Sequence, residues 1–173
     1  SKSLMQFTSG EVAYLLNEGK AFGTQVWGQQ LGVNDYPVLG SAYKVLMAAR
    51  DGLEGSIYWA TFSNLNSNAE LIDPMGGIAV YNATVSDGTL TLAKRSDNNV
   101  YSGEGVLLKA NREYVNAKNI SDYVAATTGE NDLLATPAEA GVLNDTNYKH
   151  YRLTYNDVDS KEGIGFYLGV VKD

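Results

Sequence analysis

The chain contains no cysteine and only one histidine, His150. Without cysteine there can be no disulfide, no thiolate nucleophile and no thiolate zinc site. One histidine excludes a His-rich metal site and leaves His150 as the sole imidazole base for a nucleophilic triad. No Gly-x-Ser-x-Gly elbow accompanies it, so we expect His150 to be an ordinary residue at the edge of a strand.

Proline and long apolar runs are also scarce. Only 3 of the 173 residues are proline, and no apolar stretch approaches the ~20 residues that cross a bilayer. We therefore expect no direct insertion into a membrane. The opening Ser-Lys-Ser-Leu-Met lacks the pattern of a secretory signal peptide.

Positive charge is in short supply, with 13 basic against 20 acidic residues and a net charge of -7. This balance argues against a nucleic-acid partner. Residues 1–54 hold four basic and five acidic side chains (net -1), and residues 55–173 hold nine and fifteen (net -6). A polar stretch bounded by glycine lies between them at 50–55. We predict a short unit over 1–54, which could belong to an upstream module, followed by a domain over 55–173.

The first unit carries one helix signal. Thr8 and Glu11 have the spacing of a capping box, and apolar residues at i, i+3 and i+4 follow. With Gly19 as the stop, the pattern predicts a short helix over roughly 9–18 that needs a neighbour to be stable. A strand is expected over 43–47.

Beyond residue 55 the apolar pattern changes to a period of two, which is typical of strands. The expected strands are 57–62, 78–85, 90–93, 105–109, 113–115, 151–155 and 164–170. Asp87-Gly88 predicts a tight hairpin between the second and third of them. We also expect 105–109 to pair with 113–115, and a turn to join 151–155 to 164–170. The pattern predicts a mainly β fold, an antiparallel β-sandwich or open barrel, preceded by the short helix and strand.

The aromatic content suggests a binding surface. The chain has 12 tyrosines and 2 tryptophans, and flat rings with polar tips can stack on sugars. The candidates for such a platform are Trp59, Tyr58, Tyr151 and Tyr155. Because Tyr58 and Trp59 are adjacent in a predicted strand, their side chains must point to opposite faces. The alternative is that these residues simply fill a half-buried sheet.

Two other kinds of site remain open. Paired carboxylates would suffice for a glycosidase, with candidates Glu104, Glu113, Glu130 and Glu139, although nothing in the sequence brings two of them together. A structural calcium could lie at Asp157 and Asp159, whose surroundings fail the EF-hand template; the alternative is a plain turn. No catalytic residue, metal site or cofactor is otherwise indicated.

Several segments resemble exported and surface modular proteins of Bacteroidota of the Bacteroides and Prevotella type. In the first unit they are 9–17, Trp27-x-Gln29-x-Leu31-Gly32 and Tyr36-Pro37-Val38-Leu39. In the second unit they are Tyr58-x-Ala60-Thr61-Phe62, Gly88-Thr89-Leu90-Thr91-Leu92, Asn131-Asp132-Leu133-Leu134 and Gly165-Phe166-Tyr167.

The resemblance implies a secreted or cell-surface protein with a non-catalytic accessory or adhesion-type domain that binds glycan or protein. It transfers no active-site residues. Relatives usually continue for one further strand beyond the position of Asp173, which implies an open sheet edge. Another strand could fill that edge and give a homo-oligomer or a surface filament.

Overall fold

The structure, a computed structural model, is mainly β with antiparallel sheets and a few short helices, as the sequence predicted. It describes residues 1–20, 22–47, 49–50, 56–120, 130–135, 151–156 and 163–168.

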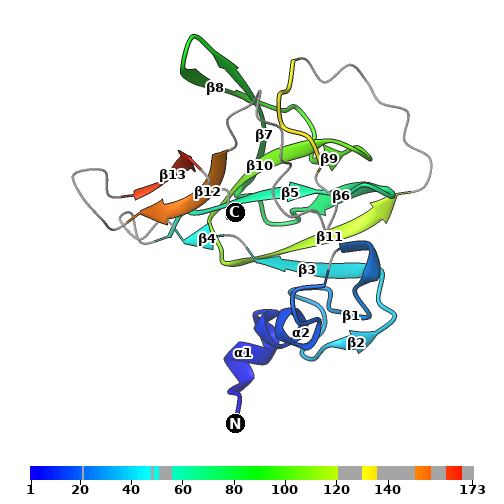
Figure 1. Cartoon of the computed structure of the whole chain (residues 1–173). Coiled ribbons are helices and arrows are strands. Elements are labelled where there is room, and N and C mark those ends of the chain that lie inside the picture. The colour runs from blue at the N-terminus through cyan, green and yellow to red at the C-terminus, as the bar shows by residue number, and fades with distance from the viewer. Residues whose placement is uncertain are drawn as a thin grey trace, which may run out of the picture.

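Two sheets form the sandwich at the centre of the molecule (Figure 1). In spatial order, the five-stranded sheet contains β4 (Ala49–Arg50), β5 (Tyr58–Ser63), β10 (Gly105–Ala110), β7 (Ile78–Ser86) and β8 (Thr89–Lys94). The four-stranded sheet contains β3 (Tyr43–Met47), β11 (Tyr114–Ile120), β6 (Asn68–Ile72) and β9 (Asn99–Val100). Both sheets contribute to one buried cluster that includes Phe62, Leu71, Val80, Leu108 and Val115. The sandwich therefore encloses its core between two alternating faces.

The expected pairing of 105–109 with 113–115 is wrong. β10 lies between β5 and β7 and is hydrogen-bonded to both, so neither of its edges is open to β11. β11 pairs instead with β3 and β6 in the other sheet. The turn between them is tied to the end of β7, since the Asn111 amide donates to the carbonyl of Gly77 at 3.1 Å. The connection crosses from one sheet to the other, which a hairpin pattern alone does not reveal.

Two other expected strand pairs form. β7 and β8 meet at Asp87 and Gly88, which both have positive φ, 51° and 75°. This is the twist that a two-residue hairpin requires. β12 (Tyr151–Asn156) pairs antiparallel with β13 (Gly163–Leu168). The β7–β8 hairpin projects from the top of the sandwich in Figure 1.

The N-terminal element lies below β3 in Figure 1. It contains α1 (Leu4–Thr8), α2 (Glu11–Leu16), the 3-10 helix η1 (Phe22–Thr24), β1 (Trp27–Gly28) and β2 (Val38–Leu39). Ala13 of this element is fully buried against Val45 of β3 and Tyr114 of β11, with Tyr14 and Leu31 packed around them. β3 and β4, which also lie within residues 1–54, are strands of the two sheets.

The helix predicted over 9–18 is shorter than expected and has a different cap. Gly10, with φ 90°, is the N-cap of α2 and makes no side-chain capping bond. Thr8 instead ends α1, and its hydroxyl donates to carbonyls of that helix. Glycine is required at position 10, because a Cβ there would lie 2.7 Å from Leu31 Cδ2 in a conformation that side chains rarely adopt. The capping box is made one helix earlier, by Ser3 and Gln6.

Candidate functional site

An aromatic pair lies on the outer face of the five-stranded sheet. The rings of Trp59 on β5 and Tyr81 on β7 have centroids 6.0 Å apart and are tilted by 35°. Lys109 on β10 is directly opposite Trp59 in the strand register, and its Nζ lies 5.2 Å from the centre of the Trp59 ring. All three side chains are partly exposed. We call Trp59, Tyr81 and Lys109 the outer-face site.

The period of two places these residues on one face. Phe62 of β5 and Leu108 of β10 point inward to the core, so Trp59 and Lys109, each an odd number of residues away, point outward. Tyr81 alternates in the same way with the buried Val80. This arrangement combines two apolar ring faces with a hydroxyl and an ammonium group, which can serve a ligand that has both apolar and hydroxyl-bearing sides.

The structure describes the side chains of three of the four residues of the predicted platform. Tyr58 and Trp59 lie on opposite faces of β5, as adjacent strand residues must. Tyr151 begins β12 and is 55% exposed. The side chain of Tyr155 lies outside the described residues. Sequence reasoning missed Tyr81, because only the register of β7 against β10 brings it beside Trp59.

The structure describes three of the four predicted acidic candidates. Glu104 accepts a hydrogen bond from Arg95 Nη1 at 2.8 Å, and it also accepts one from the backbone amide of Tyr101. Glu113 and Glu130 are exposed. Glu139, His150 and the calcium candidates Asp157 and Asp159 lie outside the described residues. Among the residues that are described, no three acidic or histidine side chains gather as a metal site would require.

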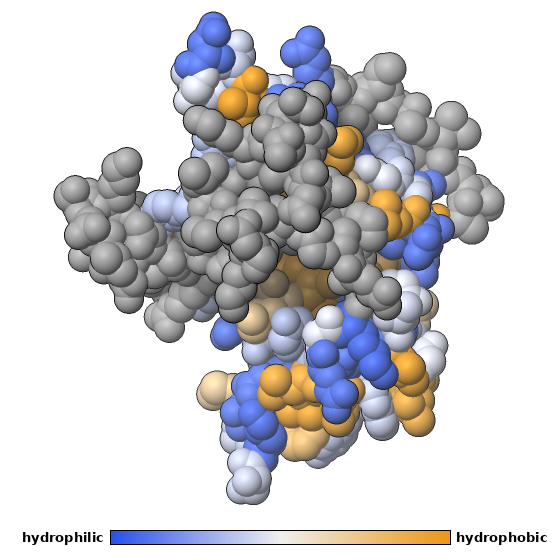
Figure 2. Space-filling model, viewed as in Figure 1, coloured by the Kyte–Doolittle hydropathy of each residue, from blue (hydrophilic) through white to orange (hydrophobic). Residues whose placement is uncertain are grey.

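Exposed apolar side chains are concentrated in the N-terminal element. Nine large apolar residues there are exposed: Leu4, Met5, Leu15, Leu16, Val26, Val33, Tyr36, Val38 and Leu39. We call them the N-terminal apolar surface. Figure 2 shows apolar side chains gathered at the lower end of the molecule, where α1, α2 and the β1–β2 ribbon lie. Patches of this kind usually mark contacts with another protein.

Buried amides attach this element to the sandwich. Asn116 of β11 accepts a hydrogen bond from the Leu31 amide at 2.8 Å and donates to the carbonyls of Gln29 and Lys44. Gln29 is fully buried and donates to carbonyls on both sides of it in the chain. The N-terminal apolar surface is therefore presented on a fixed support.

Three ionisable groups near this junction have pKa values that are shifted by their surroundings. Burial, reinforced by the nearby Glu113 carboxylate, raises the pKa of Tyr114 to about 12, and burial lowers the pKa of Lys44. On the exposed side, a hydrogen bond from Lys2 lowers the pKa of Glu11. Tyr114 therefore stays neutral in the physiological range and packs as an uncharged ring against Tyr14, 6.0 Å away between centroids.

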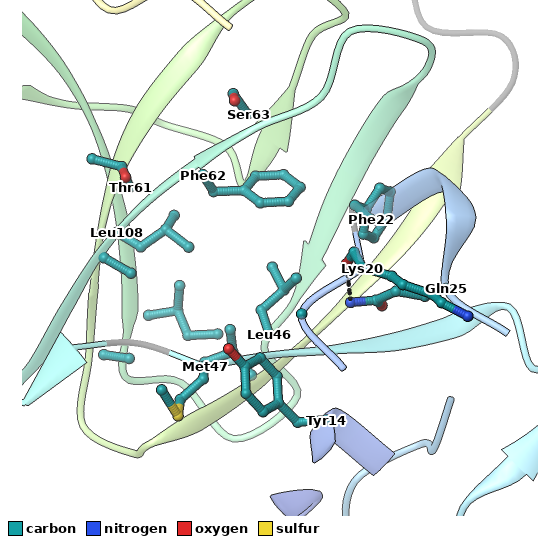
Figure 3. Close-up of a pocket in the computed structure, with 15 residues that line it drawn as sticks. Tyr14, Lys20, Phe22, Gln25, Leu46, Met47, Thr61, Phe62, Ser63 and Leu108 are labelled. Carbon is teal, nitrogen blue, oxygen red and sulfur yellow. Dashed lines mark hydrogen bonds between the residues drawn. The ribbon is translucent and has the colours of Figure 1, made fainter. Parts of the chain in front are cut away.

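A cavity of about 280 Å³ lies where the two sheets meet the N-terminal element (Figure 3). Its apolar lining includes Phe22, Leu46, Phe62, Ile78, Leu108 and Val115. Polar groups at its edge come from Tyr14, Lys20 and Gln25. Figure 3 shows the side chains of Thr61 and Ser63 turned away from it.

Within the described residues, no helix has the length and apolar character needed to cross a bilayer. The chain matches no protein-family model, no curated protein and no solved structure.

Proposed function

We propose that this protein is a non-catalytic accessory or adhesion-type module of an exported bacterial surface protein, and that its outer-face site binds glycans. The pairing of Trp59 with Tyr81 is the observation that carries the proposal. The resemblance to Bacteroidota surface proteins supports the extracellular location.

The outer-face site suits a sugar ring in three respects. The two aromatic rings come from different strands of one sheet, so the backbone hydrogen bonds of β10 hold them at a fixed spacing. Stacking on a rigid surface costs little conformational entropy. The Tyr81 hydroxyl and the Lys109 ammonium supply hydrogen-bonding groups beside the rings.

The Trp59→Ala variant tests this proposal. For a polysaccharide whose gel retains the wild type, the affinity measured from retention should fall at least about tenfold. That change corresponds to a loss of roughly 1.4 kcal/mol in binding free energy. Tyr36→Ala is the matched control: it removes another aromatic ring, 58% exposed, from the N-terminal element. Thermal melting should show that both variants are folded. Undiminished retention of a folded Trp59→Ala protein would overturn the proposal.

A second candidate function is self-association through the N-terminal apolar surface. β2 pairs only with β1 among the described strands, and both of its residues, Val38 and Leu39, are exposed. A short apolar edge of this kind can pair with the same strand of a second copy, around a twofold axis.

Light scattering over a range of protein concentrations tests self-association. We expect the wild type to form a dimer as concentration rises and Leu39→Lys to remain monomeric, because lysine blocks an edge and adds like charges across a twofold axis. Leu134→Lys is the control, since Leu134 is 75% exposed but lies in the 130–135 segment. A wild type that stays monomeric at its solubility limit would exclude this function.

A further inference from the structure

We propose that the glycan bound at the outer-face site is anionic, with carboxylate or sulfate groups on its sugar rings. This inference rests on the proposed function, because it names the class of glycan that the same site takes. The observation that carries it is that a lysine lies directly beside each of the two aromatic rings. Lys109 lies opposite Trp59 in the strand register, and Lys94 of β8 lies opposite Tyr81.

The strand register places Lys94 on the outer face. β10, β7 and β8 are consecutive strands of the five-stranded sheet (Figure 1), and Lys94 is the direct partner of Tyr81 across β7 and β8. Residues directly opposite one another in an antiparallel pair have their side chains on the same face. Lys94 therefore points outward beside Tyr81, and it is exposed.

The two lysines stand at opposite ends of the aromatic pair. Lys109 Nζ lies 5.2 Å from the centre of the Trp59 ring. Lys94 lies two strands away from Lys109 and two residues further along, so the strand spacing and rise place their Cα atoms about 12 Å apart. An oligosaccharide that stacks on both rings therefore meets one ammonium group beside each of them.

No acidic residue of this face neutralises the two lysines. Among the outward-facing residues of β5, β10, β7 and β8, none is Asp or Glu. Within the part of the chain that the structure describes, neither ammonium forms an ion pair with a carboxylate. Asp132 of the 130–135 segment lies at the other end of β7, where it accepts a hydrogen bond from the Val85 amide at 2.7 Å. The face therefore offers two positive charges to a ligand.

This local charge counts for more than the net charge of the chain. At physiological ionic strength the Debye length is about 8 Å, so distant exposed charges are largely screened from a ligand on this face. The net charge of -7 also opposes non-specific adsorption to a polyanion. Retention on an anionic gel would therefore report a specific contact.

Two pairs of polysaccharides separate charge from sugar stacking. Polygalacturonate and its methyl ester differ in the carboxylate, and dextran sulfate and dextran differ in the sulfate. We expect the wild type to bind the anionic member of at least one pair about tenfold more tightly, since each exposed ion pair adds up to roughly fivefold. Raising the salt to about 0.5 M should reduce that preference. The pair that shows the preference identifies the anionic group.

Replacement of the lysines by glutamine tests their role. Lys94→Gln and Lys109→Gln should each weaken binding of the preferred anionic polysaccharide by roughly twofold to fivefold. The double variant should bind the anionic and neutral members about equally. Lys20→Gln is the matched control, because it removes the same charge from an exposed residue of the N-terminal element, and it should keep the full preference. Thermal melting reports whether each variant is folded.

The outcomes separate this inference from glycan binding itself. If the wild type binds both members of each pair equally, or if the folded double variant keeps the full preference, the glycan is not selected by charge. Stacking on Trp59 and Tyr81 would then remain as proposed. Retention on none of these gels would also overturn the anionic class, whereas glycan binding is judged independently by the Trp59→Ala variant.

Discussion

Replacing Glu104 by alanine should lower the free energy of unfolding by about 3 kcal/mol or more. Glu104 Oε2 lies 2.8 Å from Arg95 Nη1, and the two side chains are only 14% and 3% exposed. Removing one partner of a buried ion pair typically costs roughly 3–5 kcal/mol. Arg95 keeps a second, more exposed partner in Asp97, whose Oδ1 lies 3.8 Å from its Nε, so we expect the loss to fall near the lower end of that range. The Tyr101 amide would lose an acceptor as well. Denaturant unfolding measures this loss.

The control for this prediction is Glu113→Ala, because Glu113 is exposed. Its effect should stay within about 0.5 kcal/mol. The double variant Arg95→Met with Glu104→Leu should recover much of the stability, since apolar replacement of both buried partners is often neutral. A loss of less than about 1 kcal/mol for Glu104→Ala would mean that solvent reaches the pair and that the Arg95 side chain is not held as described.

Asn116→Ala should destabilise the protein by roughly 3 kcal/mol and loosen the N-terminal element. The substitution removes three hydrogen bonds, to Leu31, Gln29 and Lys44. Each buried backbone group left without a partner costs about 1–3 kcal/mol. Hydrogen exchange of the amides in α2 and β1 should accelerate more than exchange in β7 or β10.

Asn119→Ala is the matched control on the same strand. Asn119 is exposed, and the one hydrogen bond that the structure shows to its side chain comes from the Ser67 hydroxyl. This variant should be nearly neutral. If Asn116→Ala accelerated exchange equally in all strands, the N-terminal element would not depend on this side chain for its attachment.

The hairpins were predictable because their signals are local. Asp87-Gly88 supports positive φ at both turn positions, and the alternating runs on either side set the strands. The partners of β10 and β11 were not predictable in this way. Which strands become neighbours depends on contacts between distant segments, and two strands of the second sheet, β6 and β9, are not among those that the sequence pattern predicts.

The N-terminal motifs illustrate a different limit. Gln29 stands out in the sequence as part of the Trp27-x-Gln29-x-Leu31-Gly32 segment, and the structure shows that it is a buried hydrogen-bonding residue rather than a ligand-binding one. Gly28 is needed because a Cβ there would lie 2.0 Å from the carbonyl oxygen of Tyr43. Neither role can be read from local spacing, since the Gln29 side chain donates to the distant carbonyl of Phe7 and Gly28 lies against a strand that comes later in the chain.

The outer-face site was predictable in part. The period of two shows that Trp59 points away from Tyr58. It does not show that Trp59 is the outward one, nor that Tyr81 and Lys109 join it, because those facts depend on strand register. The cavity was beyond sequence reasoning, since its walls come from five separate strands and from the loop around Gln25.

The most direct test of the central proposal is an NMR titration of the wild-type protein with an oligosaccharide. The oligosaccharide is prepared from a polysaccharide whose gel retains the protein. We predict that the indole N–H signal of Trp59 and the backbone signals of Tyr81 and Lys109 shift together, and that mass spectrometry recovers the oligosaccharide intact. Shifts confined to other faces would contradict glycan binding at the outer-face site, and a shortened oligosaccharide would contradict a non-catalytic module.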